Sequence, residues 1–481
     1  MNFARDVVDA APPGDRALVE ITREGDRREW TFGEVADGSA RLAGTLVARG
    51  VRRGDVVMTL IGNRPEWVLT MVACFRIGAV ALPCNEQLRA KDLRQRLDAA
   101  QPKLIVADAR NAAELEAAGI EAGPGLILIP DEALYAAQPP PAVELDLTDP
   151  CLITFTSGTT GEAKGIVHGQ RYLPGQRLQA THWLGGRRGD LVWCTAASGW
   201  SKSARNVFIA PWLTGAAALL HDARFDPAQR LEILAAEQVN VLCMAPTEYR
   251  VIAKRVELVP VPSLHGLVAA GEALNPEVLR AFKEATGLEI RDGYGQTETG
   301  QLTGVPAGGA VRPGSMGRPL PGVALEVDDG ELVLADPRTD PTFFVATLGG
   351  PPSPEDRPWR TGDRVTADED GYLYFEGRTD DVIISAGYRI GPFEVESALV
   401  SHGAVAEAAV VAAADDERGA VVRAVVVLRE GFSPSDELVT ELQDHVKHET
   451  APYKYPRIVD FAAELPKTAS GKVQRALLRG A

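Results

Sequence analysis

Hydroxyl groups, glycines and one lysine are concentrated between Thr154 and Gly165, directly after an apolar run. Glycines let backbone N–H groups approach an anion closely, and serine and threonine hydroxyls donate further hydrogen bonds. Lys164 adds a positive charge, so the segment predicts a loop that binds phosphates. It is not a Walker A motif, which needs Gly-Lys followed at once by Ser or Thr. A flexible connection is the alternative interpretation. The candidate phosphate-binding residues are Thr156, Ser157, Gly158, Thr159, Thr160, Gly161 and Lys164.

Four further motifs follow this loop along the chain. Residues 294–300 read Tyr-Gly-Gln-Thr-Glu-Thr-Gly, residues 360–363 read Arg-Thr-Gly-Asp, and residues 377–381 read Gly-Arg-Thr-Asp-Asp. Residues 465–472, close to the C-terminus, form a second glycine-bearing loop that ends in a lysine. Five such motifs in this order resemble the acyl-adenylate-forming superfamily of AMP-forming acyl-CoA synthetases, from about Trp30 to the C-terminus. Within it, segments 199–204, 387–399 and 450–457 resemble medium-chain acyl-CoA synthetases.

The composition restricts the compartment and the partners of the protein. Fifty basic and 66 acidic residues give a formal net charge of −16, which argues against a nucleic-acid-binding surface. The five cysteines lack metal-ligand spacing, and their odd number argues against a complete disulfide framework. The most membrane-like stretch, Leu69 to Leu82, contains Arg76 and is too short to span a bilayer. We therefore expect a cytoplasmic protein without a membrane span, acting on small molecules as a monomer or homodimer.

Alternating strands and helices predict an α/β fold with mostly parallel sheets. Thr31 and Glu34 have the spacing of a capping box, and the helix that they begin runs to Gly50. Composition predicts a surface loop over residues 336–357, where prolines, glycines and charges gather. The other expected strands are 55–62, 79–84, 239–244, 265–271, 404–412 and 421–428, and the other expected helices are 65–77, 246–255, 275–286, one from Pro392 and 436–448.

The chain of 481 residues is too long for a single ordinary core. Beyond residue 380 the pattern changes to that of a small α+β domain. We therefore expect two domains, a large N-terminal adenylation domain over 1–379, with the ATP and acyl sites, and a small C-terminal domain over 380–481. The resemblance implies that the C-terminal domain is mobile and turns about a hinge at Asp380.

The resemblance implies a reaction in which a carboxylate attacks the α-phosphorus of ATP as pyrophosphate leaves. Both reactants are anionic, so the site needs hydrogen-bond donors, cations and a metal ion. Glu298 would help to bind Mg²⁺, a hard cation that prefers oxygen ligands, and Thr297 would contact the α-phosphate. Asp363 can accept hydrogen bonds from both ribose hydroxyls, and Arg378 would lie beside it. The other implied ATP- or AMP-binding residues are Gly271, Glu272, Ala273, Asp292, Gly293, Tyr294, Gly295 and Gln296.

The C-terminal motifs imply a change of catalytic residues between the two steps. Lys472 would bridge the carboxylate and the α-phosphate in the first step. Rotation of the domain would withdraw Lys472 and bring residues 387–389 to the site for the second step. In the first conformation, before this rotation, Arg389 can contact phosphate. Gly387 would line the pantetheine channel, because a missing Cβ leaves room there. The implied CoA-binding residues are Gly387, Tyr388, Lys447 and Lys454.

Trp200 and Gly295 are the residues that the resemblance places at the acyl pocket. Acetyl-specific relatives carry tryptophan at the position of Gly295, so we expect free space there for a longer acyl chain. Arg205 stands where the resemblance leads us to expect an aromatic or apolar side chain. If it faces the pocket, it would favour a substrate with a second polar or acidic group.

The implied activity is that of an AMP-forming acid–CoA ligase that uses ATP, Mg²⁺ and CoA on a medium-chain, branched or aromatic carboxylic acid. Two alternatives stay open. A ligase that delivers the acyl group to a carrier protein would share the same core, and an inactive nucleotide-binding sensor would bind ATP without releasing pyrophosphate.

Overall fold

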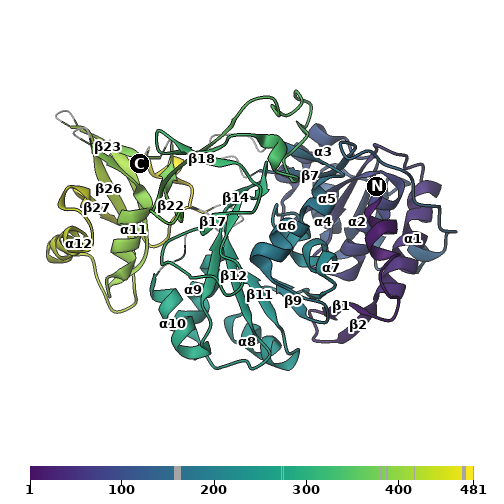
Figure 1. The fold of residues 1–481 in the computed structure, drawn as a ribbon, viewed down its shortest axis with the longest axis horizontal. Coiled ribbons are helices and arrows are strands. Elements are labelled where there is room, and N and C mark those ends of the chain that lie inside the picture. The colour runs from purple at the N-terminus through teal and green to yellow at the C-terminus, as the bar shows by residue number, and fades with distance from the viewer. Residues whose placement is uncertain are drawn as a thin grey trace.

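The computed structural model describes residues 1–156, 164–271, 274, 276–379, 381–385, 388–415, 418–467 and 473–479. Figure 1 shows a large N-terminal lobe and, at the end opposite α1 (Phe32–Ala48), a small group of C-terminal elements. The lobe contains two seven-stranded sheets with mostly parallel strands. The α/β fold class that the sequence predicts is therefore confirmed. Among the described residues, no helix is long and apolar enough to cross a membrane.

The first sheet carries the phosphate-loop candidate. Its central strands are parallel, whereas β7, β8 and β20 pair with one another in antiparallel fashion. The loop from Thr156 to Lys164 therefore connects two neighbouring strands of a hairpin. The strands, in spatial order, are β20 (Ala346–Thr347), β8 (Gly165–Gly169), β7 (Pro150–Phe155), β4 (Val80–Cys84), β3 (Val56–Leu60), β5 (Leu104–Asp108) and β6 (Leu126–Ile129).

The second sheet positions the nucleotide-site candidates Gly271, Asp292 and Gly293. All of its strand pairs are parallel except that of β1 with β2. Gly271 and Asp292 therefore lie at the same edge, where β12 and β13 end. The strands, in spatial order, are β13 (Ile290–Gly293), β12 (Gly266–Ala270), β11 (Val241–Met244), β9 (Leu191–Cys194), β10 (Ala217–His221), β1 (Arg16–Ile21) and β2 (Arg27–Thr31).

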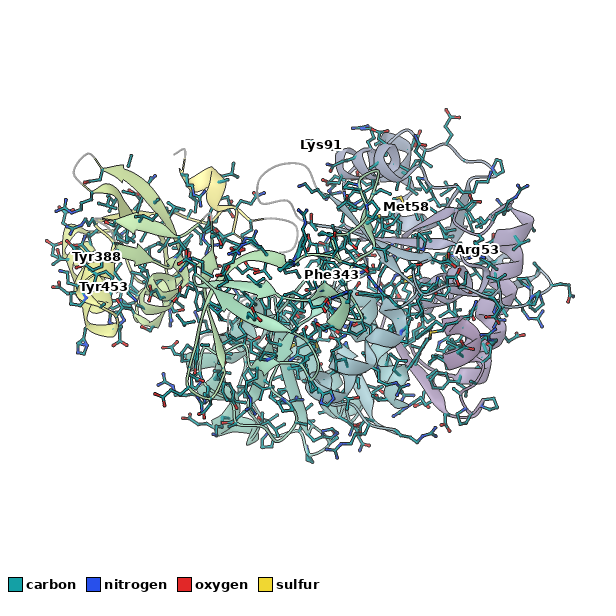
Figure 2. All side chains as sticks on the ribbon, turned by 45° about the horizontal axis from the view of Figure 1, so that its top comes forward. Arg53, Met58, Lys91, Phe343, Tyr388 and Tyr453 are labelled. Atoms are coloured by element: carbon teal, nitrogen blue, oxygen red, sulfur yellow. The ribbon has the colours of Figure 1, made fainter. Side chains whose placement is uncertain are left out.

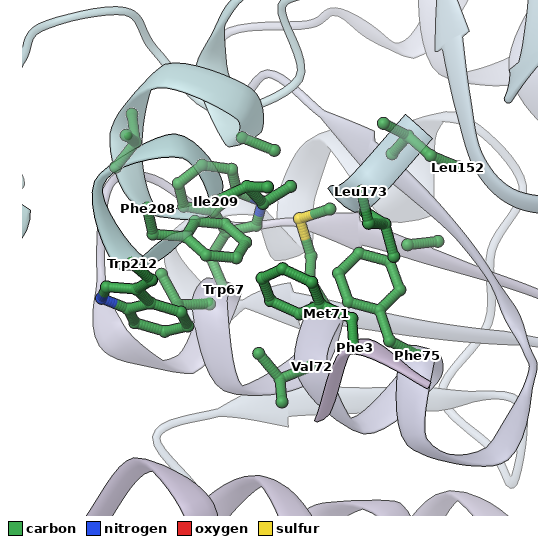
Figure 3. Packing of buried hydrophobic residues seen from close by; sticks show 14 of the residues in the cluster. Phe3, Trp67, Met71, Val72, Phe75, Leu152, Leu173, Phe208, Ile209 and Trp212 are labelled. Carbon is green, nitrogen blue, oxygen red and sulfur yellow. The ribbon is translucent and has the colours of Figure 1, made fainter. Parts of the chain in front are cut away.

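Helix α2 (Pro65–Ile77) lies in the largest hydrophobic core, and nearly all of its side chains are buried. Its sequence is apolar around the whole circumference, which is typical of a helix enclosed by other elements. Figure 3 shows Phe208 and Ile209, from the short π-helix η5 (Arg205–Ile209), packed beside Trp67 of α2. The ring centroids of Trp67 and Phe208 are 5.7 Å apart in an edge-to-face contact. This packing fixes η5, and with it Arg205, relative to the first sheet.

Local sequence signals predict most of the helix ends. The side chain of Thr31 accepts a hydrogen bond from the backbone of Glu34, whose side chain accepts one from the backbone of Thr31, so the capping box at α1 is confirmed. Helix α2 and α9 (Pro246–Arg255) have the predicted bounds, and α10 (Pro276–Thr286) agrees with the predicted helix over all of its described residues, since Asn275 lies outside them. The lobe's other helices are α3 (Ala90–Ala100), α4 (Ala112–Ala117), α5 (Tyr172–Gly175), α6 (Arg177–Gln179), α7 (Ala210–Thr214) and α8 (Pro227–Ala236).

The prediction of a surface loop over residues 336–357 is wrong in its central part. Phe343 and Phe344 are buried, and β20 joins the edge of the first sheet. The rings of Phe343, Phe344 and Trp359 pack against one another at centroid distances between 4.8 and 5.7 Å. Prolines and glycines at the two ends of the segment masked the apolar pair, so composition averaged over the whole segment gave the wrong result.

Four strands connect the lobe to the C-terminal elements, in the order β18 (Leu325–Asp328), β19 (Glu331–Leu334), β21 (Trp359–Ala367) and β22 (Leu373–Arg378). The core of the C-terminal domain begins at Ile383. The predicted boundary and hinge at Asp380 lie between β22 and this core, but Asp380 itself is outside the described residues. The C-terminal elements are β23 (Ile383–Ser385), β24 (Tyr388–Ile390), α11 (Pro392–Ser401), β25 (Val405–Asp415), β26 (Gly419–Leu428), α12 (Asp436–Glu449), β27 (Ile458–Phe461) and α13 (Arg475–Arg479).

Candidate nucleotide and acyl site

The phosphate-loop candidate is closed at its base by a backbone pair. The backbone N–H of Thr156 donates to the carbonyl of Lys164 at 2.9 Å, and the N–H of Lys164 donates to the hydroxyl of Thr156 at 3.4 Å. The antiparallel pairing of β7 and β8 brings these two residues together. Lys164 is exposed. The predicted phosphate-binding residues Ser157, Gly158, Thr159, Thr160 and Gly161 lie outside the described residues.

Asp363, on β21, is the centre of a hydrogen-bond cluster built from three separate segments. Its Oδ2 accepts hydrogen bonds from the hydroxyl of Tyr294 and from Nε2 of Gln296, the latter at 2.8 Å. Its Oδ1 accepts from Nη1 of Arg378 at 3.0 Å. Burial raises the pKa of the Asp363 carboxyl, whereas Arg378, Tyr294 and Gln296 oppose this rise. The register of β21 with β22 places Asp363 directly opposite Arg378.

Gln296 fixes the position of the 294–300 motif on β21. Its Nε2 also donates to the carbonyl of Thr361 at 2.8 Å, and its Oε1 accepts from Nε1 of Trp359 at 3.2 Å. A carboxylate accepts about four hydrogen bonds, and protein donors already occupy three of those sites on Asp363. A ribose that uses both hydroxyls on this carboxylate must therefore displace one of the protein donors.

Glu298 is the candidate for a metal ligand. Its side chain is half-buried, and its backbone carbonyl accepts a hydrogen bond from Phe344 N–H at 2.8 Å. Burial raises the pKa of the Glu298 carboxyl, while the positive charges of Arg378 and Lys164 oppose this rise. Hence Glu298 lies within electrostatic range of both the phosphate loop and the Asp363 cluster. The preceding residue, Thr297, is also half-buried.

The residues fit a magnesium ion that binds mainly through phosphates. The part of the chain that the structure describes contains no group of three or more His, Cys, Asp or Glu side chains able to hold a metal. Mg²⁺ usually keeps several waters and takes one or two carboxylates together with substrate phosphates. Glu298, one partly desolvated carboxylate within electrostatic range of Lys164, is compatible with that requirement.

Lys202 lies at the shared edge of β12 and β13, where sequence reasoning assigned it no role. Its Nζ donates to the carbonyl of Ala270 at 2.8 Å. Next in the chain, Gly271 has φ of +103°, and a Cβ there would lie 3.1 Å from Nζ of Lys202. On β13, Asp292 is buried, and burial raises its pKa well above the ordinary value, against the opposing charge of Lys202. The sequence signal that could have identified Lys202 as a site residue is its place in the 199–204 motif. The predicted neighbours Glu272 and Ala273 are outside the described residues.

The free space expected at Gly295 is not present. Gly295 pairs with Gln301 across the short hairpin of β14 (Gly295–Gln296) and β15 (Gly300–Gln301), and a Cβ at Gly295 would overlap the carbonyl oxygen of Gly300. The glycine is required by the close approach of the two backbones. This corrects the expectation that an acyl chain occupies the room left by a missing side chain. Gly293 is similarly confined, since a Cβ there would lie 2.8 Å from the carbonyl of Thr303.

Trp200 begins the turn that leads into η5. Its carbonyl accepts hydrogen bonds from the N–H of Ser203 at 2.8 Å and from the hydroxyl of Ser203 at 2.7 Å. Its side chain is half-buried, in contrast to the fully buried Trp67, Trp183 and Trp193. A tryptophan that keeps part of its surface accessible is compatible with a place at the mouth of a pocket, and the role of Trp200 in the acyl site stays a prediction.

The predicted CoA-binding residues lie on the C-terminal domain. Figure 2 shows Tyr388 and Tyr453 side by side, and their rings stack with centroids 4.3 Å apart. Lys454 Nζ lies 5.7 Å from the ring of Tyr453, and Lys447 Nζ lies 4.5 Å from the ring of Tyr455. The same view shows Phe343, next to the Glu298 site, far from this pair. The structure therefore does not bring the CoA candidates to the Asp363 cluster. The predicted residues Gly387 and Lys472, and the side chain of Arg389, are outside the described part of the chain.

Comparison with known proteins shows the family. The family model described as AMP-binding enzyme matches residues 5–338, and the model described as AMP-binding enzyme C-terminal domain matches residues 394–472. The chain belongs to the AMP-binding enzyme family. The resemblance to acyl-adenylate-forming enzymes inferred from the five motifs is thereby confirmed.

The curated relatives of this family member are acyl-CoA synthetases. The chain is 38% identical to human mitochondrial acyl-coenzyme A synthetase ACSM4, with 99% of this chain and 90% of that protein covered. It is also 38% identical to an uncharacterized acyl–CoA ligase of Bacillus subtilis, with coverage of 96% and 92%. These relatives confirm the predicted enzyme class, an AMP-forming acyl-CoA synthetase.

Solved structures agree with the curated relatives. An anthranilate CoA ligase in complex with anthranoyl-AMP has a TM-score of 0.88 at 28% identity, with 100% of this chain and 97% of that chain covered. A benzoate CoA ligase from Burkholderia xenovorans has a TM-score of 0.86 at 28% identity, and both chains are covered completely. A Brucella canis acyl-CoA synthetase is 34% identical with a TM-score of 0.75, and covers 100% of this chain and 94% of its own.

Proposed function

We propose that this enzyme activates a medium-chain, branched or aromatic carboxylic acid with ATP and Mg²⁺, and transfers the acyl group from the adenylate to CoA. The Asp363 cluster is the observation that carries the proposal. It joins Tyr294 and Gln296 to Arg378 on a buried carboxylate, and Glu298 of the same motif lies within electrostatic range of Lys164 and Arg378. This arrangement supports a role for Asp363 as the acceptor of ribose hydroxyls, with cations nearby for the phosphates.

In the first step, a carboxylate oxygen of the acid bonds to the α-phosphorus as the bond to pyrophosphate breaks. Lys164 and the loop that it ends would hold the leaving phosphates, and Thr297 would donate to the α-phosphate. Mg²⁺, held by Glu298, would neutralise phosphate charge when bound. Lys472 would reduce the repulsion between the two anions as they meet.

In the second step, the thiol of CoA replaces AMP on the acyl carbon. We assign the CoA nucleotide to the exposed aromatic pair Tyr388 and Tyr453, which adjoins Lys454, a half-buried cation paired with Glu394. Because this pair is far from the Glu298 site in the structure, the assignment requires the C-terminal domain to turn about the predicted hinge at Asp380. A carrier protein remains the alternative acceptor.

We place the reaction in the cytoplasm, with a monomer or homodimer as the active unit. All five cysteines are free and buried, which suits a reducing compartment. The relative from Bacillus subtilis is compatible with this assignment, whereas the mammalian relatives carry mitochondrial names.

The test is ATP-dependent pyrophosphate release with a panel of carboxylic acids, each measured with and without CoA. We expect release to require an acid, and turnover to require CoA. In Asp363→Asn, kcat/KM for ATP should fall by roughly 10- to 100-fold, because hydrogen bonds to a charged acceptor contribute about 1.5–3 kcal/mol. Asp328→Asn is the matched control, since Asp328 is an exposed carboxylate on β18 of the same sheet and pairs with Arg360.

Three results would contradict the proposal. Equal losses in Asp363→Asn and Asp328→Asn would remove Asp363 from the nucleotide site. ATP binding without pyrophosphate release with any acid would favour an inactive sensor. Acid-dependent release without acyl-CoA formation, together with acylation of a carrier protein, would favour the alternative acceptor.

A further inference from the structure

Arg205 introduces a positive charge into the interior of the lobe. Its side chain is 4% exposed, and every residue of η5 is buried. The apolar residues Phe208 and Ile209 hold this short helix against α2 (Figure 3). Nη1 of Arg205 would lie 3.4 Å from a Cβ at Gly300, so the guanidinium lies against the end of the 294–300 motif, two residues from Glu298.

The guanidinium is only partly satisfied by the protein. Its Nε and Nη1 are buried without a hydrogen-bond partner among the described residues. The hydroxyl of Tyr172 is close enough that the charge of Arg205 opposes the burial that raises its pKa to about 12. Buried donors without partners are rare in proteins, and a buried charge usually has a counter-ion.

The nearby groups do not supply that counter-ion. Asp340 feels the charge of Arg205, but its Oδ1 accepts hydrogen bonds from Thr342 N–H at 2.8 Å and from the Thr342 hydroxyl at 2.7 Å, and its Oδ2 has no partner within the described chain. Arg171, the other cation near Asp340, pairs with Glu355. His168 is uncharged at neutral pH, because burial and the charges of Arg205 and Arg171 lower its pKa to about 3.

The position of Arg205 relative to the proposed site indicates which group pairs with its buried charge. Trp200, at the proposed acyl pocket, begins the turn that leads into η5, and Gly300 ends the motif that carries Thr297 and Glu298. We propose that Arg205 binds a second carboxylate at the distal end of the acyl substrate, so that the preferred acids are dicarboxylic. This inference rests on the proposed function and names its substrate class.

A distal carboxylate would bring acceptor oxygens and a counter-charge to the buried guanidinium of Arg205. The Nε–H of a guanidinium points to the side of Nη2, so a carboxylate that uses the free Nη1 binds at the end of the side chain, to Nη1 alone or to Nη1 and Nη2 together. An apolar acyl end would leave both donors buried and unpaired. Sites built to hydrogen-bond a substrate group discriminate strongly against analogues that lack it.

The experiment compares acids that differ only at the distal end. Each straight-chain dicarboxylic acid of four to eight carbons is paired with the monocarboxylic acid in which an isopropyl group replaces the distal carboxylate. Acyl-CoA formation and pyrophosphate release give kcat/KM for both members. We expect the wild type to prefer the dicarboxylic acid of at least one pair, and Arg205→Met to lower that preference by roughly 10- to 100-fold. Arg188→Met, which removes an exposed arginine paired with Asp15, should leave the preference unchanged.

A purely structural role for Arg205 predicts a different result. If Arg205 only balances Asp340, Arg205→Met should lower kcat/KM for both acids of a pair equally, and the double variant with Asp340→Asn should restore both; that outcome overturns the inference. If Arg205→Met does not fold, the preference is read in Arg205→Lys, which keeps the charge but loses the paired donors, and an unchanged preference there overturns the inference as well. Failure of the wild type with every acid would contradict the proposed function itself, whereas turnover of monocarboxylic acids alone would contradict only the role of Arg205.

Discussion

The carboxyl of Asp340 should make the stability of the N-terminal lobe depend on pH. Asp340 is 2% exposed, and Thr342 donates two hydrogen bonds to one of its oxygens. Burial raises the pKa of Asp340 from 3.8 to about 7, although the charges of Arg171 and Arg205 oppose the rise. The folded protein therefore retains a proton that the unfolded chain releases at lower pH.

The sign of the effect follows from proton linkage. Below the unfolded pKa both states are protonated at Asp340, and the full stability is present. As the pH rises from about 3.8 to about 7, the unfolded state gives up the proton first, so the free energy of unfolding falls. Each pH unit corresponds to about 1.36 kcal/mol per proton, and the slope halves where the folded carboxyl titrates, so the loss between pH 5.5 and 8 is about 2 kcal/mol. Asp340→Asn keeps an acceptor oxygen for Thr342 and cannot ionise, so it should not show this loss.

Urea unfolding of the lobe at several values between pH 5.5 and 8 measures the effect. The free energy of unfolding of Asp340→Asn minus that of the wild type should rise by about 2 kcal/mol between pH 5.5 and 8 and level off at the upper end of this range. Asp336→Asn is the control. Asp336 lies in the same segment but on the surface, where Arg338 lowers its pKa. The free energy of unfolding of Asp336→Asn minus that of the wild type should therefore not rise over this range. Parallel pH profiles for Asp340→Asn and the wild type would refute the reasoning.

Three further substitutions test the remaining assignments. Lys472→Ala should slow adenylate formation on the order of 10²- to 10³-fold while sparing thioester formation from supplied acyl-AMP, and equal damage to both half-reactions would contradict its role. Asp380→Pro should preserve one half-reaction and block the other, because proline fixes φ near −65°; unchanged turnover with CoA would show that Asp380 is not the hinge. Gly295→Ala, whose single added carbon would overlap the Gly300 carbonyl, should lower thermal stability and reduce kcat/KM similarly for acids from two to eight carbons; a changed ranking of chain lengths would restore Gly295 to the acyl pocket.

Local interactions explain what the sequence alone could determine. The capping box at Thr31 and the N1 prolines of α2 and α9 act within one helical turn, so their residue types predict the helix starts directly. Alternation of apolar strands and helices was sufficient for the α/β class, because parallel strands need crossover helices. The five motifs in order were sufficient for the family and the enzyme class.

Contacts between residues that are distant in the sequence could be identified only from the tertiary structure. Composition predicted a surface loop over residues 336–357, but Phe343 and Phe344 are buried against Trp359. A missing side chain at Gly295 looked like space for substrate, whereas the facing strand of a two-stranded hairpin uses that space. In both cases the partner lies elsewhere in the chain, and periodicity within a segment carries no information about it.

The same distinction holds for the candidate site. The sequence identified Asp363 and Arg378 through motifs, but only the register of β21 and β22 shows that they face each other, and only the fold adds Tyr294 and Gln296 to that carboxylate. The unusual residue type at position 205 was visible in the sequence. Its burial and its two unpaired donors depend on how η5 packs between α2 and the 294–300 motif, because burial and hydrogen bonding are properties of the assembled tertiary structure.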